Sequence, residues 1–139
     1  MHKVYTSLDE FNKQNTELNA KLLVTDDIKV LSSPLQIGQK TVPNRLVCQA
    51  MEGCDGKADG SPDTLTKRRY DRFAKGGAGL IWFEATAVMG EGRANPRQLY
   101  INENNLDHFK RQVENIKNTA LKENGYEPTV IMQATHSGR

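Results

Sequence analysis

Three apolar runs of strand length, each ending on a polar residue, dominate the hydrophobic pattern of this chain. They are Leu46-Val47-Cys48-Gln49, Leu80-Ile81-Trp82-Phe83-Glu84 and Val130-Ile131-Met132-Gln133. Strands that are apolar throughout are usually buried on both faces, as in a parallel sheet covered by helices. The runs therefore predict parallel strands over residues 46–49, 80–84 and 130–133, adjacent in that order. Their polar ends would meet at the edge where α/β proteins place their chemistry.

Helical patterns separate these runs. A helix is expected over residues 64–75, because Ser61-Pro62-Asp63 offers a start and Gly76-Gly77 an end. Its inward positions would be Leu65, Tyr70, Phe73 and Ala74. The second helix has apolar residues three and four positions apart, which marks one helix face: Leu106, Phe109, Val113, Ile116 and Ala120. Asn102 or Asn104 would cap its start and Gly125 its end.

The order strand, helix, strand, helix, strand predicts an α/β fold with right-handed connections and both helices on one side of the sheet. Residues 1–30 have a thin apolar stripe and are expected to form a peripheral extension, with Ser7 and Glu10 as a capping box for a short helix. Two alternating runs around Gly38, between Pro34 and Val42, predict a tight hairpin before the first core strand.

Composition favours small-molecule chemistry. The chain has 139 residues, with 19 Lys and Arg against 17 Asp and Glu, and this net charge of +2 argues against a nucleic-acid or anionic-membrane partner. It contains no signal peptide and no apolar run long enough to cross a membrane, so a cytoplasmic location is expected. Cys48 and Cys54 lack the spacing of a zinc site, and no metal is expected.

Several polar residues near the strand ends could carry chemistry. The amide of Gln49 or Gln133 can donate and accept at once, which suits the edge of a ring such as a flavin pyrimidine, or it can satisfy loop backbone groups. Glu84 in its apolar run could act as an acid or base, or could pair with an arginine or a backbone amide. His136 could contact a cofactor or substrate, or could simply be packed and hydrogen-bonded.

Taken together, short motifs between Pro34 and Arg139 resemble the old yellow enzyme family of FMN-dependent oxidoreductases. The order and spacing of these motifs carry the resemblance: Pro34-Leu35-Gln36-Ile37-Gly38, Pro43-Asn44-Arg45-Leu46-Val47, Gly76-Gly77-Ala78-Gly79-Leu80-Ile81, Glu84-Ala85-Thr86-Ala87-Val88, Gly92-Arg93 and Gln133-Ala134-Thr135-His136-Ser137-Gly138-Arg139. The resemblance implies a TIM (β/α)₈ barrel that holds FMN at its C-terminal face. NADH or NADPH would reduce this FMN, and an activated alkene or related acceptor would reoxidise it.

The resemblance also implies site residues. Cofactor-binding positions would be Gln49, Ala50, Met51, Glu52, Ala85 and Gln133, with His136 and Arg139 close behind the pocket. The family commonly has Pro at the place of Ala50, and members that tune the flavin with a thiol have Cys at the place of Glu52. Glu52 would add negative charge near the ring, or would point into its loop and pair with a cation. Cys54 falls at a substrate-facing position, which leaves the substrate open.

The length of the chain suggests a truncated barrel, since a complete (β/α)₈ barrel needs roughly 200 residues or more. Residues 31–139 would be the N-terminal part of an FMN-binding barrel with its first three β/α units. The family's substrate-anchoring pair and proton-donating Tyr would lie beyond Arg139, so no catalytic residue is expected within this chain. Turnover by the isolated chain is therefore expected to be absent, and its FMN binding weak or absent.

Two functional interpretations follow. The chain is the N-terminal part of an FMN-dependent NAD(P)H oxidoreductase of the ene-reductase type, or it is an inactive fragment that self-associates or pairs with another chain. Association is expected in either case and a homo-oligomer is favoured, because apolar side chains on the inner face of the sheet need cover. The residues expected on that face are Val47, Ile81, Phe83, Val130 and Ile131.

Overall fold

The computed structural model describes residues 4–137, which fall into two compact units divided between Leu31 and Ser32. In the first unit, helix α1 (Leu8–Glu17) begins at Ser7, whose side chain accepts a hydrogen bond from the Glu10 amide at 3.1 Å. The Ser7 half of the predicted capping box is therefore confirmed, whereas the Glu10 carboxylate accepts a hydrogen bond from the Thr6 amide at 3.1 Å. Helix α1 buries none of its residues, and a four-residue helix α2 (Lys29–Ser32) spans the boundary in the sequence.

A hairpin opens the second unit. Strands β1 (Leu35–Ile37) and β2 (Lys40–Val42) pair antiparallel, with Ile37 opposite Lys40. Gly38 lies in the turn with φ of +56°, a conformation that glycine adopts without steric cost. The hairpin predicted around this glycine is confirmed.

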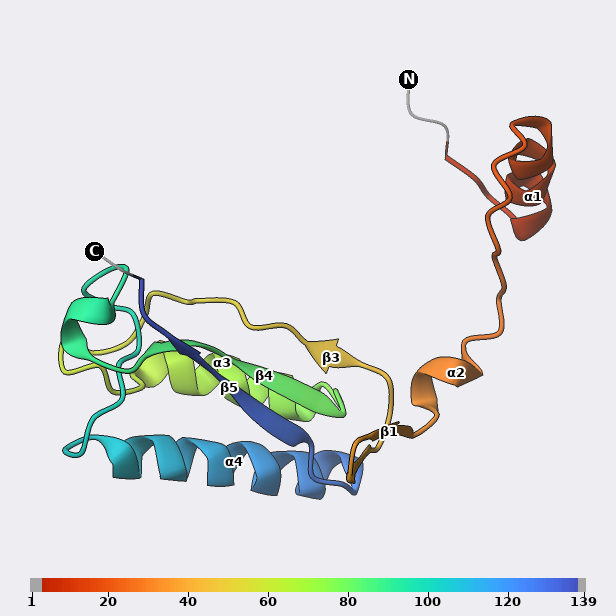
Figure 1. Ribbon diagram of the computed structural model, residues 1–139. Coiled ribbons are helices and arrows are strands. Elements are labelled where there is room, and N and C mark those ends of the chain that lie inside the picture. The colour runs from red at the N-terminus through yellow and green to blue at the C-terminus, as the bar shows by residue number, and fades with distance from the viewer. Residues whose placement is uncertain (1–3, 138–139) are drawn as a thin grey trace. The chain divides into compact units, whose positions relative to one another are not determined.

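The predicted parallel sheet is also confirmed. Strands β3 (Val47–Cys48), β4 (Leu80–Ala87) and β5 (Thr129–Thr135) are parallel and adjacent in the order β3-β4-β5 (Figure 1). Strand β4 is three residues longer than expected, and β3 is shorter because the chain after Cys48 leaves the ladder. Between β4 and the next helix lies a loop with a short 3-10 helix η1 (Gly90–Gly92).

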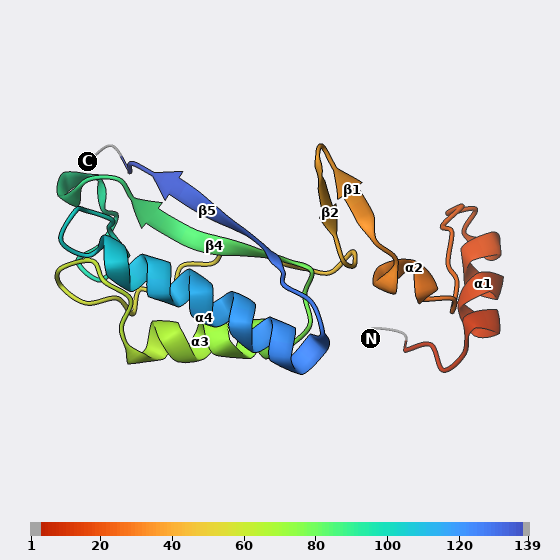
Figure 2. The ribbon, with the colours of Figure 1, turned by 90° about the horizontal axis from the view of Figure 1, so that it is seen from below.

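Two helices pack side by side on the same face of this sheet (Figure 2). They are α3 (Thr64–Lys75) and α4 (Leu106–Asn124), and the bounds of α3 are those predicted. The core between helices and sheet is aromatic at its centre, where Tyr70 stacks on Phe83 with ring centroids 4.2 Å apart. The remaining buried apolar residues of this cluster are Ala74, Ala78, Ile81, Leu99, Phe109, Ile116 and Ala120.

Two apolar residues predicted to face inward do not. Leu65 is 48% exposed and Leu106 is 41% exposed, while Thr66 and Gln112 are buried. The inward side of α3 runs through Thr66, Tyr70 and Ala74, which are four residues apart, and Leu65 lies about 100° away from it. The positions of the aromatic and small core residues therefore determine the rotation of each helix about its axis, and with it the side that faces the sheet.

The start of α4 also differs from its prediction. Its N-cap is Asn105, and neither Asn102 nor Asn104 takes that place. The Asn102 side chain instead accepts hydrogen bonds from the amides of Asn104 and Asn105, which forms a turn just before the helix. At the other end, Gly125 has φ of +79° and closes the helix as predicted.

The sheet face away from the helices carries a different set of side chains from the one predicted. Because side chains alternate along a strand, Ile81 and Phe83 point to the helices and are buried, and Val130 packs partly against the same core. The exposed apolar residues on the other face are Val47, Trp82 and Ile131, with Trp82 and Ile131 paired across β4 and β5. Within residues 4–137, no helix is long and apolar enough to span a membrane.

The two sides of α4 should differ in their sensitivity to truncation. Ile116→Ala removes a side chain with no solvent exposure and should lower the free energy of unfolding by about 2–5 kcal/mol. Leu106→Ala on the same helix is the matched control and should cost about 1 kcal/mol or less. Urea unfolding followed by circular dichroism measures both, and equal losses would contradict the observed orientation of α4.

Candidate functional site

The residues predicted to line the cofactor gather at the C-terminal edge of the sheet. Gln49 and Ala50 directly follow β3, and Met51 and Glu52 continue into the loop beyond it. Ala85 lies in the last part of β4. In β5, Met132 pairs with Phe83 and Ala134 with Thr86, so that Gln133 lies opposite Glu84 and Ala85. One edge of the sheet therefore holds every member of the predicted set.

Their accessibility is uneven. Gln49, Met51, Glu52 and Gln133 are exposed. Gln133 comes two residues after Ile131 in β5, so strand alternation places it on the face away from the helices. Ala85 is only 7% exposed, and its carbonyl accepts a hydrogen bond from the buried Gln98 amide at 3.2 Å. Exposed amides of Gln49, just after β3, and Gln133, on β5, are therefore available to a ligand at this edge, while Ala85 on the central strand is small and largely covered.

Glu84 anchors this edge from inside the protein. Its side chain is 1% exposed; Oε2 accepts a hydrogen bond from the Gly53 amide at 3.0 Å, and Oε1 lies 2.7 Å from Arg69 Nη2. The Glu84 backbone amide donates to the Tyr70 hydroxyl at 2.7 Å. Of the two roles that the sequence left open for Glu84, pairing with an arginine and a backbone amide is confirmed.

Arg69, on α3, connects Glu84 to the loop after β3. Its Nη2 also lies 2.9 Å from Asp55 Oδ1, and its Nη1 donates to the Met51 carbonyl at 3.2 Å. Thr66, one turn earlier, donates to the same Asp55 oxygen at 2.6 Å. The Arg69 guanidinium thus fixes the loop through the Met51 carbonyl and the Asp55 carboxylate. Its third partner, Glu84, is on the central strand.

Gly53 is required by this arrangement. A Cβ at that position would collide with the Arg69 guanidinium and would lie 2.8 Å from Asp55 Oδ2. The backbone must approach this closely because its amide reaches the buried Glu84 carboxylate. Any side chain at position 53 would therefore displace either the loop or the arginine.

Burial raises the pKa of the Glu84 carboxyl above its ordinary value of 4.5, and the Gly53 amide and the Arg69 guanidinium offset only part of this effect. Burial likewise raises the pKa of Tyr70, whose hydroxyl lies against the Glu84 backbone. Neither group is available as a proton donor at the sheet edge, since Glu84 and Tyr70 are both fully covered.

The loop residues Glu52 and Cys54 lie beside each other. The Cys54 thiol donates weakly to Glu52 Oε2 at 3.9 Å, and Cys54 Sγ accepts from Asn95 Nδ2 at 3.1 Å. Among the described residues Glu52 has no cationic partner. Cys54 has φ of +47°, a strained conformation for a residue with a side chain.

His136 follows β5 and packs against the η1 turn. A Cβ on Gly92 would come within 2.8 Å of the imidazole Cδ2, and the Ser137 amide donates to the Gly92 carbonyl at 2.8 Å. Gly92 thus gives room for the imidazole at this end of the sheet. Arg139, predicted to lie nearby, is outside the described residues.

Sequence reasoning missed Arg69, Asp55 and Gln98. The sequence contained a signal for Arg69. This arginine lies four residues after Leu65 and four before Phe73, within the helix face predicted to be apolar, and Glu84 is an acidic residue within an apolar strand. A cation in an apolar stripe and an acid in an apolar strand are a natural pair. Asp55 and Gln98 lie in loops, where no periodic pattern marks a buried polar side chain.

Removal of Arg69 should loosen the loop. Arg69→Met leaves the buried Glu84 carboxylate without its cation and should lower the free energy of unfolding by about 3 kcal/mol. Hydrogen exchange at the Gly53 amide should accelerate in parallel. Arg68→Met, which removes an exposed neighbouring cation, is the control and should change neither quantity appreciably. Unchanged exchange at Gly53 in Arg69→Met would show that the loop is held by something else.

A pH series isolates the contribution of Glu84. Because its folded pKa is raised, its contribution to stability is complete below about pH 4.5 and is lost as the pH rises through the folded pKa. The unfolding free energy of the wild type minus that of Glu84→Gln should therefore fall as the pH rises above about 4.5. Urea titrations at each pH measure it. A difference that grows with pH would show that the attraction of Arg69 outweighs burial.

Comparison with known proteins shows the family of this chain. The family model of the NADH:flavin oxidoreductase / NADH oxidase family matches residues 30–137. An NADPH dehydrogenase of Geobacillus sp. (strain WCH70) is 33% identical over 113 residues, which cover 79% of this chain and 31% of the relative. That of Geobacillus thermodenitrificans (strain NG80-2) is 34% identical over 112 residues, with the same shares covered. The chain thus spans about a third of the length of these curated relatives.

Solved structures agree on the fold. The old yellow enzyme from Trypanosoma cruzi superposes with a TM-score of 0.64 at 22% identity, covering 80% of this chain and 28% of that one. Morphinone reductase in complex with tetrahydroNAD gives a TM-score of 0.65 at 24% identity, with 78% and 28% covered. The βαβαβ arrangement described above is consistent with part of the barrel of these enzymes. The chain belongs to the NADH:flavin oxidoreductase / NADH oxidase family, and its resemblance to old yellow enzyme is confirmed.

Proposed function

We propose that this chain forms part of an FMN-dependent NAD(P)H oxidoreductase of the ene-reductase type and supplies the flavin-ring side of the cofactor site. Its three strands and two helices would be the beginning of the first three β/α units of the barrel. The observation that carries the proposal is the gathering of Gln49, Met51, Ala85 and Gln133 at one sheet edge, in a chain of this family.

The residues at this edge fit a flavin ring. The exposed amides of Gln49 and Gln133 can each donate and accept, as the pyrimidine edge of an isoalloxazine requires. Between them, Ala85 presents only a methyl group, which leaves room for a flat ring. FMN, once bound, would accept a hydride from NADH or NADPH and pass it to an activated alkene or related acceptor.

Within that site, the residues of this chain would bind and orient the ring. Arg69 holds the Met51 carbonyl and the Gly53 amide is held by Glu84, so the backbone from Gln49 to Gly53 has a fixed path past the sheet edge. A site whose loop is fixed before binding loses less entropy when the ligand arrives. No residue of this chain is proposed as a proton donor, since its two buried candidates, Glu84 and Tyr70, are both covered.

Glu52 would tune the ring electrostatically. It is exposed in the same loop and has no cationic partner among the residues that the structure describes. A carboxylate at this position would disfavour added negative charge on a neighbouring ring and would lower its reduction potential. The lining residues therefore bear on the potential of the cofactor as well as on its orientation.

A second candidate function is a non-catalytic role in which this chain pairs with another chain. The observation that favours it is the uncovered sheet face with Val47, Trp82 and Ile131, together with exposed Met132 at the edge strand β5. A second copy of the chain could cover this face, which fits the proposed homo-oligomer in the cytoplasm. This role is the alternative to the enzymatic one, in which the other strands of the barrel would cover the same face.

The cofactor proposal can be tested by titrating the isotope-labelled 139-residue chain with FMN and with riboflavin. Both should shift the amide resonances of Gln49 to Glu52, Ala85 and Gln133, because the two ligands share the ring. Their affinities should be similar and weak, since in this family the elements that grip the phosphate come from the last strands of the barrel.

Gln133→Leu is the test variant for this titration, and Gln39→Leu in the hairpin turn is its matched control. The first should weaken the shifts for both ligands and the second should leave them unchanged. Shifts confined to residues away from the sheet edge, or equal effects of the two variants, would contradict the proposed ring site.

A further inference from the structure

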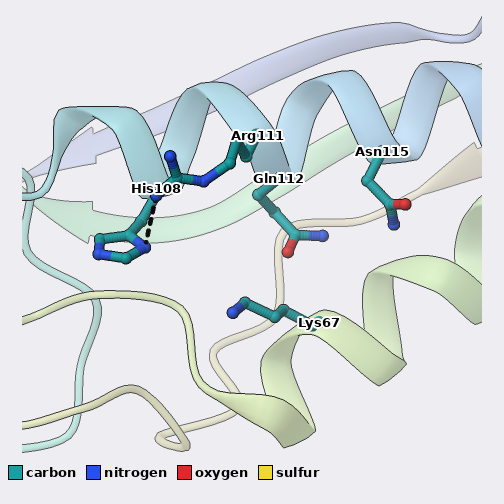
Figure 3. A pocket seen from close by; sticks show the side chains of 5 residues that line it. All are labelled: Lys67, His108, Arg111, Gln112 and Asn115. Carbon is teal, nitrogen blue, oxygen red and sulfur yellow. Dashed lines mark hydrogen bonds between the residues drawn. The ribbon is translucent and has the colours of Figure 1, made fainter.

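A groove between the two helices is unrelated to the proposed flavin edge. It is a space of about 350 Å³ lined by Lys67 from α3 and by four residues of α4, namely His108, Arg111, Gln112 and Asn115 (Figure 3). Both helices lie on one face of the sheet (Figure 2), whereas strand alternation places Gln133 of the proposed flavin edge on the opposite face. A ligand here would therefore occupy the outer side of the helix layer.

The lining of this groove is rich in hydrogen-bond donors. Lys67 and Arg111 are cations, Gln112 and Asn115 carry amide NH₂ groups, and none of the five residues is acidic. Arg111 Nη2 lies 3.1 Å from His108 Nδ1. Because a guanidinium can only donate, that nitrogen of His108 must accept, which leaves the proton of the neutral ring on Nε2 as a further donor.

One of these donors lacks an acceptor. Gln112 is 3% exposed, and its Nε2 has no hydrogen-bond partner among residues 4–137. Its side chain leaves α4 on the side facing Lys67 of α3 (Figure 3). A buried amide nitrogen without a hydrogen-bond partner is rare in proteins and lowers their stability. A ligand acceptor that reaches Gln112 Nε2 from the groove would supply the missing hydrogen bond.

The helix backbones also favour a negatively charged ligand in this groove. Lys67 is the fourth residue of α3 and His108 the third of α4, so the groove opens beside the N-terminal turns of two helices. The N-terminal turn of a helix carries partial positive charge and attracts anions; Asp63 already caps α3, whereas α4 has no side-chain cap. Side chains and helix dipoles thus act in the same direction.

We propose that this groove is a binding site for an oxyanion of the phosphate class, either free or as a phosphomonoester. A tetrahedral oxyanion offers several acceptors in different directions, and the donors here come from two helices at once. Arg111, oriented by His108, and Lys67 would contact its oxygens from opposite sides of the groove. The amide of Gln112 would supply the neutral donor at the floor. This inference does not depend on the proposed oxidoreductase function.

The probes are inorganic phosphate and glycerol 3-phosphate, titrated into the isotope-labelled 139-residue chain at ionic strength held constant with sodium chloride. Both should shift the side-chain NH₂ signals of Gln112 and the Nε–H signal of Arg111, while chloride alone should not. If both probes bind, the site recognises the phosphate group itself. If only one of them binds, that probe shows whether the ligand is free phosphate or a phosphomonoester.

Variants separate a site from general charge attraction. Lys67→Met and Arg111→Met should each weaken phosphate binding about three- to fivefold. Lys122→Met, which removes a cation from the far end of α4, should leave it unchanged. Gln112→Met should weaken binding without lowering the thermal stability of the phosphate-free chain, because it removes a donor that has no partner there. Equal effects of Lys122→Met and Arg111→Met, or no shift at Gln112 with either probe, would overturn the proposal.

Discussion

A carboxylate inside the central strand of a sheet cannot stay charged there without partners, and much of this structure is arranged around that requirement. Glu84 meets it with the Arg69 guanidinium and the Gly53 amide. Breaking such a pair from one side is costly, because the remaining charge stays buried. The pair therefore ties three segments that are distant in sequence, namely the loop after β3, helix α3 and strand β4.

Helix α3 is the element that carries most of this arrangement. Within five residues it presents Thr66 and Arg69 to Asp55 and the Tyr70 hydroxyl to the backbone amide of Glu84. The same Tyr70 ring stacks on Phe83 in the apolar core. The position of the proposed ring-lining loop thus depends on how this helix packs against the sheet. A change in that packing would move Met51 and Gly53 although neither belongs to the core.

The sequence predicted regular structure well where a single periodicity decided it. Helix 64–75, the hairpin around Gly38 and the order of the three strands followed from apolar spacing and from glycines that end elements. The side that each residue faces was less predictable. Leu65 and Leu106 satisfy the helical spacing and are still exposed, because aromatic stacking and small residues such as Ala74 and Ala120 set the rotation of the helices.

The polar constellation of the site was predictable only in part. Pairing with an arginine or a backbone amide was one of the two roles that the sequence left open for Glu84, but the identity of its partners depends on a loop path that no local pattern encodes. Gly53 could be read only as a loop glycine, whereas its role is to let a backbone amide reach a buried carboxylate past a guanidinium. Glu84 lies 31 residues from Gly53 and 15 residues from Arg69 in the sequence, so these pairings result from the fold and not from a local motif.

Three successive cations of α3 show how position within one helical turn decides what a charge does. Arg69 forms ion pairs with the carboxylates of Asp55 and Glu84 and so holds the loop in place, whereas Arg68 is exposed. Lys67, rotated by about 200° from Arg69, faces α4 and a groove with no acidic lining residue. Its charge is uncompensated within that groove, beside a buried amide that also lacks an acceptor. An anion is therefore the ligand class that the outer side of this helix pair would attract, whereas on the other side the charge of Arg69 is already neutralised by Asp55 and Glu84.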